Sequence, residues 1–220
     1  MIDVHGELYS VKERPAMLPK MKIQRGLFWF LSIAVALVSY RFVVLGMKTG
    51  FPNMAHQLVS SNYAFYMHVI FAPIALAIAP FQLSEKFRAK SLSRHRLLGR
   101  IYVGAVLVAG LSGIMIGFDA MHGPIAQAGF ILLAVIWLVV TFKAVKFARR
   151  REIGLHREWM IRSIALTFAG VMLRVWLPAQ LISGVPFDVA YQVVSWLCWV
   201  PNLIVAEYFV RELRNTKSSH

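Results

Sequence analysis

Acidic residues are scarce in this chain. It has 220 residues, of which 10 are Asp or Glu and 24 are Lys or Arg, so its formal net charge is +14. Charged residues make up 15% of the sequence, against about 25% in soluble domains. The acidic residues are too few, and too peripheral to the apolar runs, for paired-carboxylate catalysis or a carboxylate proton relay. The basic excess falls in short connectors between apolar runs, which indicates a membrane protein and not a nucleic-acid-binding one.

Cysteine is nearly absent. The one cysteine, Cys198, lies inside an apolar run, so no intrachain disulfide can form. The sequence also lacks a glycine-rich phosphate loop, paired metal-binding cysteines, an HExxH motif and a serine-nucleophile elbow. These absences remove the usual signatures of nucleotide-binding, zinc-dependent and serine-hydrolase chemistry. Histidine is therefore the best remaining candidate for chemistry.

Long apolar runs dominate the sequence, in which 58% of residues are hydrophobic. A helix needs about 20 apolar residues to cross a hydrocarbon core of about 30 Å. Only helices and closed barrels satisfy their backbone in lipid, and these runs do not alternate as barrel strands do. The sequence therefore predicts an all-α, polytopic membrane protein, with six transmembrane helices in one bundle over 26–210. A basic cytoplasmic tail is expected at 1–25 and a second cytoplasmic tail at 211–220. The six predicted spans are 26–46, 62–84, 98–119, 124–146, 158–182 and 187–210.

The basic residues predict how the bundle is oriented. Twenty of the 24 Lys and Arg residues fall in the two tails and in the connectors after the second and fourth spans. The connectors on the other face hold Lys48 alone. Because cytoplasmic loops carry the excess of Lys and Arg, both termini are expected in the cytoplasm. The same residues are expected to contact anionic lipid headgroups, and no nucleic-acid partner is expected.

Small and polar residues form stripes along single faces of four predicted spans. The stripe of the second span has two interpretations: close helix packing through small residues, or a slot for a flat cofactor or a lipid tail. The glycines of the third span favour packing. The polar stripes of the fifth and sixth spans should face the bundle interior, because lipid cannot satisfy them. In span order the stripes are His68, Ala72, Ala75, Ala79 and Gln82; Gly110, Gly113 and Gly117; Ser163, Thr167, Gly170 and Arg174; and Gln192, Ser195, Trp199, Asn202 and Ala206.

Four histidines lie inside the predicted spans or at their ends. His68 and His122 belong to the second and fourth spans on the outer side. His95 and His156 belong to the third and fifth spans on the inner side. Imidazoles on facing helices can ligate haem iron axially, so all four are candidate metal ligands. A haem held by the outer pair would need ligands offset by about 9 Å in depth, whereas the inner pair is matched.

The alternative interpretation, in which a histidine plays no part in chemistry, applies differently to these four residues. His95, His122 and His156 each lie at an expected membrane edge, where a histidine is often solvated or binds a lipid headgroup. His68 lies inside the membrane, where polar residues are usually functional. The order of the four histidines over six helices resembles the ascorbate-reducible transmembrane cytochromes b. In that family the second and fourth helices hold one haem and the third and fifth hold another, so the resemblance implies haem b in two sites.

A second resemblance rests on strings of residues. These are His68 to Pro80-Phe81-Gln82, the segments 95–102 and 156–163, and Trp196 to Pro201-Asn202 and Ala206-Glu207. In these strings the chain is similar, over about 62–211, to a bacterial family of integral membrane proteins known as a domain of unknown function. The similarity implies the six-helix fold and a multi-pass location in the bacterial cytoplasmic (inner) membrane.

The first functional hypothesis is a b-type haem electron-transfer protein, which moves electrons between a quinol or other donor and an acceptor. Any enzymatic activity would then be that of a membrane oxidoreductase, with haem b and a quinone as the expected cofactors. Arginines close to the histidines would pair with the haem propionates. The alternative is a non-redox membrane protein that binds a lipid or small anionic molecule in the bundle, or a small transporter. The arginines of the first hypothesis are Arg41, Arg96, Arg162 and Arg174.

Overall fold

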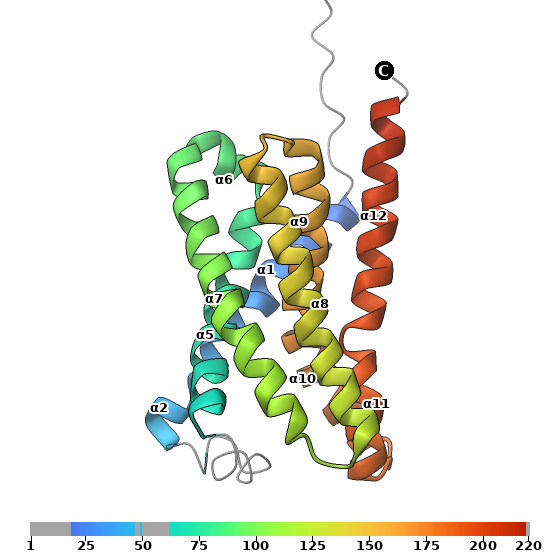
Figure 1. The fold of residues 1–220 in the computed structure, drawn as a ribbon. Helices are drawn as coiled ribbons and strands as arrows, with labels where there is room; N and C mark the ends of the chain where they lie inside the picture. Colours follow the sequence, from blue (N-terminus) through green and yellow to red (C-terminus); the bar gives the residue numbers. More distant parts are fainter. Residues whose placement is uncertain (1–18, 47–48, 50–61, 219–220) are drawn as a thin grey trace, which may run out of the picture.

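The computed structural model describes residues 19–46, 49 and 62–218, and within these ranges it contains helices and no strand. The long helices run alternately up and down in one bundle (Figure 1). In chain order the helices are α1 (Pro19–Ser39), α2 (Phe42–Leu45), α5 (Asn62–Leu83), α6 (Glu85–Lys90), α7 (Leu92–Phe118), α8 (Pro124–Arg149), α9 (Ile153–Thr167), α10 (Ala169–Ile182), α11 (Phe187–Leu197) and α12 (Val200–Ser218).

Six helical stretches are long and apolar enough to cross a membrane, which confirms the predicted fold class. Large apolar side chains cover their outward faces: Phe30, Phe142 and Ile182 are 68%, 69% and 87% exposed. A water-soluble monomer rarely exposes so much contiguous apolar surface, whereas lipid accepts it. The stretches are Ile23–Leu45, Tyr63–Leu83, Leu92–Phe118, Pro124–Arg149, Ile153–Ile182 and Phe187–Asn215.

The short helix α6, the α8–α9 connection and the C-terminal end of α12 lie at one end of the bundle (Figure 1). We call this the basic end, because it carries Lys86, Lys90 and the three arginines of 149–151. The opposite end holds α2 and the α10–α11 connection. The cytoplasmic location of the basic end stays a prediction from the charge distribution.

Two helices begin earlier than the apolar runs predicted. The Ser91 side chain caps α7 by accepting a hydrogen bond from the Arg94 backbone N–H at 3.4 Å, so α7 starts at Leu92 and not at residue 98. Serine is a preferred N-cap because its hydroxyl satisfies a backbone donor that has no partner within the helix. Helix α9 likewise starts at Ile153, before the predicted residue 158. His95 and His156 therefore lie inside their helices, in or near the first turn.

The last two spans are each interrupted midway. The fifth span divides into α9 and α10 at Phe168, and the sixth divides into α11 and α12 after Leu197. Asn202 bridges the two interruptions, since its side-chain N–H group donates to the carbonyl oxygens of Ala165 at 3.1 Å and Cys198 at 3.0 Å. An amide that satisfies backbone carbonyls in this way stabilises an interruption that lipid alone could not.

Four helices form the centre of the bundle in the ring order α5, α7, α8 and α9. Helix α1 packs outside α5, α11 packs on α8, and α12 packs on α9. Small residues allow the close approach of α7 and α8: a Cβ at Gly110 would lie 2.6 Å from Leu138, and one at Gly117 would lie 2.7 Å from Ile131. The ring order places α7 diagonally opposite α9, across the bundle interior.

Two ion pairs fasten α12 to α9 near the basic end. Arg162 donates from two nitrogens to the Glu207 carboxylate, and Arg214 donates to Glu158 at 2.6 Å. The Arg162 guanidinium also stacks on the Trp159 ring at 4.6 Å. The buried Arg162 is therefore paired inside the protein.

Candidate functional site

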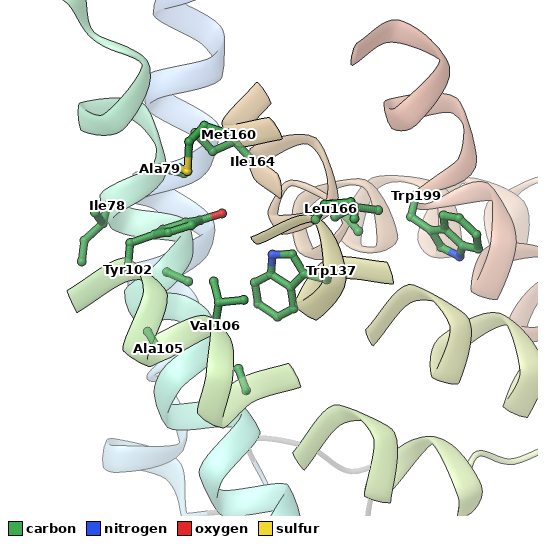
Figure 2. Close-up of a cluster of buried hydrophobic side chains, with 14 of the residues drawn as sticks. Ile78, Ala79, Tyr102, Ala105, Val106, Trp137, Met160, Ile164, Leu166 and Trp199 are labelled. Carbon is green, nitrogen blue, oxygen red and sulfur yellow. The ribbon is translucent and has the colours of Figure 1, made fainter. Parts of the chain in front are cut away.

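A cluster of buried hydroxyl groups occupies the centre of the bundle. Figure 2 shows Tyr102 reaching from α7 towards the helix that carries Met160 and Ile164. Its hydroxyl group lies 2.8 Å from Ser163 Oγ and 2.7 Å from Thr167 Oγ1. None of these three side chains is more than 6% exposed. The cluster therefore joins α7 directly to the diagonally opposite helix.

Two α8 side chains complete this hydroxyl cluster. The Trp137 indole N–H donates to Thr167 Oγ1 at 3.0 Å, and Thr141 Oγ1 lies 2.7 Å from Ser163 Oγ. Both are buried. Polar groups at this depth must find partners within the protein, because lipid offers none. The polar stripe predicted for the fifth span accordingly faces the interior at Ser163 and Thr167.

The Tyr102–Ser163 contact sets the relative depth of the inner histidines. His95 precedes Tyr102 by seven residues on α7, and His156 precedes Ser163 by seven residues on α9. Seven residues make almost two full helical turns, so each histidine lies on the same face as its partner residue, about 10 Å nearer the basic end. His95 and His156 therefore approach each other at matched depth across the bundle. They are close enough to interact electrostatically.

The ring nitrogens of the inner histidines have different surroundings. His156 Nδ1 lies 2.9 Å from the Ala144 carbonyl oxygen, which can only accept, so Nδ1 donates and Nε2 keeps its lone pair. Metal-binding histidines commonly have their tautomer fixed in this way. His95 Nδ1 is buried and has no hydrogen-bond partner. Arg88 of α6 and Arg96 both lie within electrostatic range of the His95 ring.

A cavity of about 470 Å³ lies in the other half of the bundle. Helices α1, α5, α7, α8, α10 and α11 all contribute to its lining, which is mostly apolar. Its polar side chains include Ser39, Arg41, His68 and Arg174. This volume is within the usual range for small-molecule sites, which are apolar with a few placed polar groups. In the stripe of the second span, Ala72 lines the cavity, whereas Ala75 and Ala79 are packed in the core.

His68 contributes to the cavity with a fixed orientation. Its Nδ1 lies 2.9 Å from the Ala109 carbonyl oxygen, so Nδ1 donates and Nε2 remains an acceptor or ligand atom. Ala109 follows Tyr102 by seven residues, on the face of α7 that also carries His95. One face of a single helix therefore contacts, in order, the inner histidine pair, the hydroxyl cluster and the cavity histidine.

Arg174 lies at the edge of the cavity. Its guanidinium donates to the Gly170 carbonyl oxygen at 2.7 Å and to Ser39 Oγ at 3.0 Å. Both partners are neutral, and Arg41 carries a like charge within electrostatic range of Arg174. His68 and Gln180 donate instead to the carbonyl oxygens of Ala109 and Trp176.

His122 does not join His68. It lies before α8 at φ 66° and does not line the cavity. Phe187 and Tyr191 contact its ring, with centroids 5.3 and 5.5 Å away, and both of these aromatic side chains do line the cavity. They stand between His122 and the space that His68 faces. A haem held by this pair has no geometric support, as the predicted depth offset suggested.

The Nε and one terminal nitrogen of Arg162 bind Glu207, whereas its Nη1 is buried and has no hydrogen-bond partner. Arg88 was missed by the sequence reasoning. It lies on α6, a short helix after the second span, where linear spacing gave no sign of its proximity to His95. Over residues 19–46, 49 and 62–218, no group of three or more His, Cys, Asp or Glu side chains could enclose a metal ion.

Comparison with known proteins identifies the family. The family model described as "Predicted membrane protein (DUF2306)" matches residues 65–210, which is most of the chain and includes every helix from α7 to α11. The chain therefore belongs to this family of membrane proteins, and it is a multi-pass membrane protein. No curated protein and no solved structure matches it.

Proposed function

We propose that this member of the DUF2306 family is a b-type haem electron-transfer protein of the bacterial cytoplasmic membrane. The observation that carries the proposal is the inner histidine pair. Two imidazoles at matched depth on diagonal helices provide the arrangement that bis-histidine haem needs in a helical bundle. The buried His95 Nδ1, which has no partner in the protein, gains one in an iron ligated by that ring.

Each neighbouring residue has a definite task in this proposal. The Ala144 carbonyl oxygen fixes the His156 ring, so that Nε2 is the ligand atom. Arg88 and Arg96 supply positive charge near His95 for the two propionates. Arg162 is committed to Glu207 and serves to anchor α9, the helix that carries His156. When bound, the haem supplies an iron that gains and loses one electron at a time.

The predicted topology gives the side of the membrane on which the inner pair would act. The inner pair lies at the basic end, which the positive-inside rule assigns to the cytoplasm. An electron donor that dissolves in the membrane, such as a quinol, would approach from the bilayer. The basic residues around α6 would contact anionic headgroups and hold this end at the interface.

The absorption spectrum of the purified protein tests the proposal. Protein expressed in haem-replete cells and purified in mild detergent should show a low-spin b-type spectrum in the reduced-minus-oxidised difference. His95→Ala and His156→Ala should each abolish the inner-site signal. His122→Ala is the matched control and should leave the spectrum unchanged, because His122 is remote from the pair. A folded but colourless wild-type protein would refute electron transfer and leave the non-redox function as the better hypothesis.

A further inference from the structure

We infer that the cavity beside His68 binds an anionic amphiphile, with its charged head at Arg174 and its apolar body inside the bundle. The site is separate from the inner histidine pair, and it does not require that the protein bind haem. The first observation is the charge at the edge of the cavity. Arg174 and Arg41 both line it and repel each other, and the hydrogen-bond partners of Arg174 are neutral. A guanidinium near a low-dielectric cavity is stabilised by an anion.

The second observation is where the cavity meets the surface. Arg174 is exposed, so the charged part of the cavity reaches the outside of the bundle between α1 and α10. Nearer the basic end the seam between α1, α5 and α10 is closed by Ala36, Leu76 and Val171, all buried. A ligand can therefore reach Arg174 from the outer half of the membrane, but this seam does not continue towards the basic end.

The third observation is the interior of the cavity. Leu133, Leu173 and Leu177 are among the side chains that line it, and they suit an acyl chain or a similar apolar body. His68 adds one polar atom, because its Nδ1 is committed to Ala109 and only Nε2 is available. A zwitterionic head would gain less, because it carries no net charge to offset the Arg174 guanidinium, whose hydrogen-bond partners are neutral.

The volume limits how much of a ligand enters. About 470 Å³ is the size of a site for a drug-sized molecule and not for a complete two-chain lipid. A long-chain carboxylate would insert its single chain. An anionic phospholipid would insert one chain and leave the other in the bilayer. Both present the same chemistry to Arg174, namely an oxyanion on an apolar chain.

The test measures binding of radiolabelled palmitate and of phosphatidylglycerol to the purified full-length protein, with phosphatidylcholine as the neutral comparison. Wild type should retain one anionic amphiphile per chain. Arg174→Gln should weaken its binding by about ten- to a hundredfold, the range for a lost charge-assisted hydrogen bond. Arg174→Lys should preserve part of the affinity, and Ala72→Phe, which fills the cavity, should abolish binding. Arg149→Gln, an exposed arginine at the basic end, is the matched control and should bind as wild type does.

The outcomes separate the possible occupants. Binding of palmitate, of phosphatidylglycerol or of both supports the inference and identifies the natural source of the head. Equal binding of phosphatidylcholine, or equal losses for Arg174→Gln and Arg149→Gln, would overturn it. So would loss of bound haem in His68→Ala, since that result would assign the cavity to haem. A colourless wild-type protein that still binds the anion would refute the haem proposal and leave this inference standing.

Discussion

Replacing Thr167 by valine probes the hydroxyl cluster that joins α7 to α9. Valine has nearly the shape of threonine, so the packing is conserved while one oxygen atom is lost. Thr167 Oγ1 accepts from the Trp137 indole N–H and contacts Tyr102, and its own hydroxyl donates to the Ser163 carbonyl oxygen at 2.9 Å. After the substitution Tyr102 can still donate to Ser163 Oγ. The buried indole N–H has no other partner.

The expected cost follows from these contacts. Hydrogen bonds between helices in membranes contribute about 0.6 kcal/mol each on average. The Tyr102 contact joins α7 to α9, and the bond to the Ser163 carbonyl oxygen lies within α9; taken at the same size, these two bonds account for about 1 kcal/mol. Leaving the buried indole N–H without an acceptor costs a further 1–3 kcal/mol or so. The free energy of unfolding should therefore fall by about 2–4 kcal/mol. If every lost hydrogen bond were counted equally, without the extra cost of a buried donor that has no acceptor, the expected loss of stability would be smaller.

Tyr102→Phe is the matched control. The four hydroxyl groups of the cluster carry four hydrogens, but their five contacts would need five. One of these contacts is therefore always without a hydrogen. Without the Tyr102 hydroxyl, the three that remain can donate to the Trp137 carbonyl, the Ser163 carbonyl and Thr141 Oγ1, and no donor is orphaned. The expected loss is only about 1 kcal/mol.

Reversible unfolding in mixed micelles, followed by tryptophan fluorescence, measures both variants against wild type. Thr167→Val should unfold at a clearly lower denaturant concentration than Tyr102→Phe. If Tyr102→Phe were equally or more destabilised, the count of hydrogens would be wrong, and the cluster would be held by the tyrosine and not by the indole.

Three further predictions concern packing, charge and topology. Gly129→Ala should destabilise the protein by about 1–3 kcal/mol in the same unfolding assay, because its Cβ would lie 2.9 Å from the Ser195 backbone oxygen, whereas Gly113→Ala, with its nearest neighbour at 3.4 Å, should be close to neutral. Glu207→Ala should lower the free energy of unfolding by about 2 kcal/mol, because the buried Arg162 loses its half-exposed partner. Glu85→Ala breaks an exposed pair and should lower it by at most about 1 kcal/mol. Reporter fusions should show the outside after Thr49, Gly123 and Gly184 and the cytoplasm after Lys90, Ile153 and Ser218; a cytoplasmic signal at Gly123 would contradict the predicted orientation.

The spans were predictable because lipid imposes a length and a composition that can be read directly from sequence. Interior stripes were predictable for the same reason, since polar groups such as Ser163 and Ser195 must avoid lipid. The helix starts were less accurate. Hydropathy ignores caps, and the Ser91 cap extends α7 through a charged segment that no apolar window includes.

The cavity and the residues at its edge could not be predicted from the sequence. Ser39 and Arg174 are 135 positions apart, and their hydrogen bond depends on how α1 packs against α10. Nothing in either helix alone specifies that contact. His122 was assigned to the outer site by order along the chain, but order does not show which aromatic side chains intervene. Phe187 and Tyr191, from a helix about 65 residues later, separate it from His68.

One signal for the inner site was present in the sequence and depends on spacing rather than on the histidines themselves. Tyr102 and Ser163 each follow a histidine by seven residues, and a hydrogen bond between them leaves little freedom in the relative depth of His95 and His156. Sliding α9 by one residue along α7 would break the Tyr102 contact and misplace the histidine pair together. The hydroxyl cluster thus couples the stability of the bundle centre to the geometry of the inner pair. Under the haem proposal, Ser163→Ala should therefore broaden or shift the haem spectrum even though Ser163 contacts neither ring. An unaltered spectrum would show that other contacts of α9, such as Tyr102–Thr167 and Arg162–Glu207, hold its register.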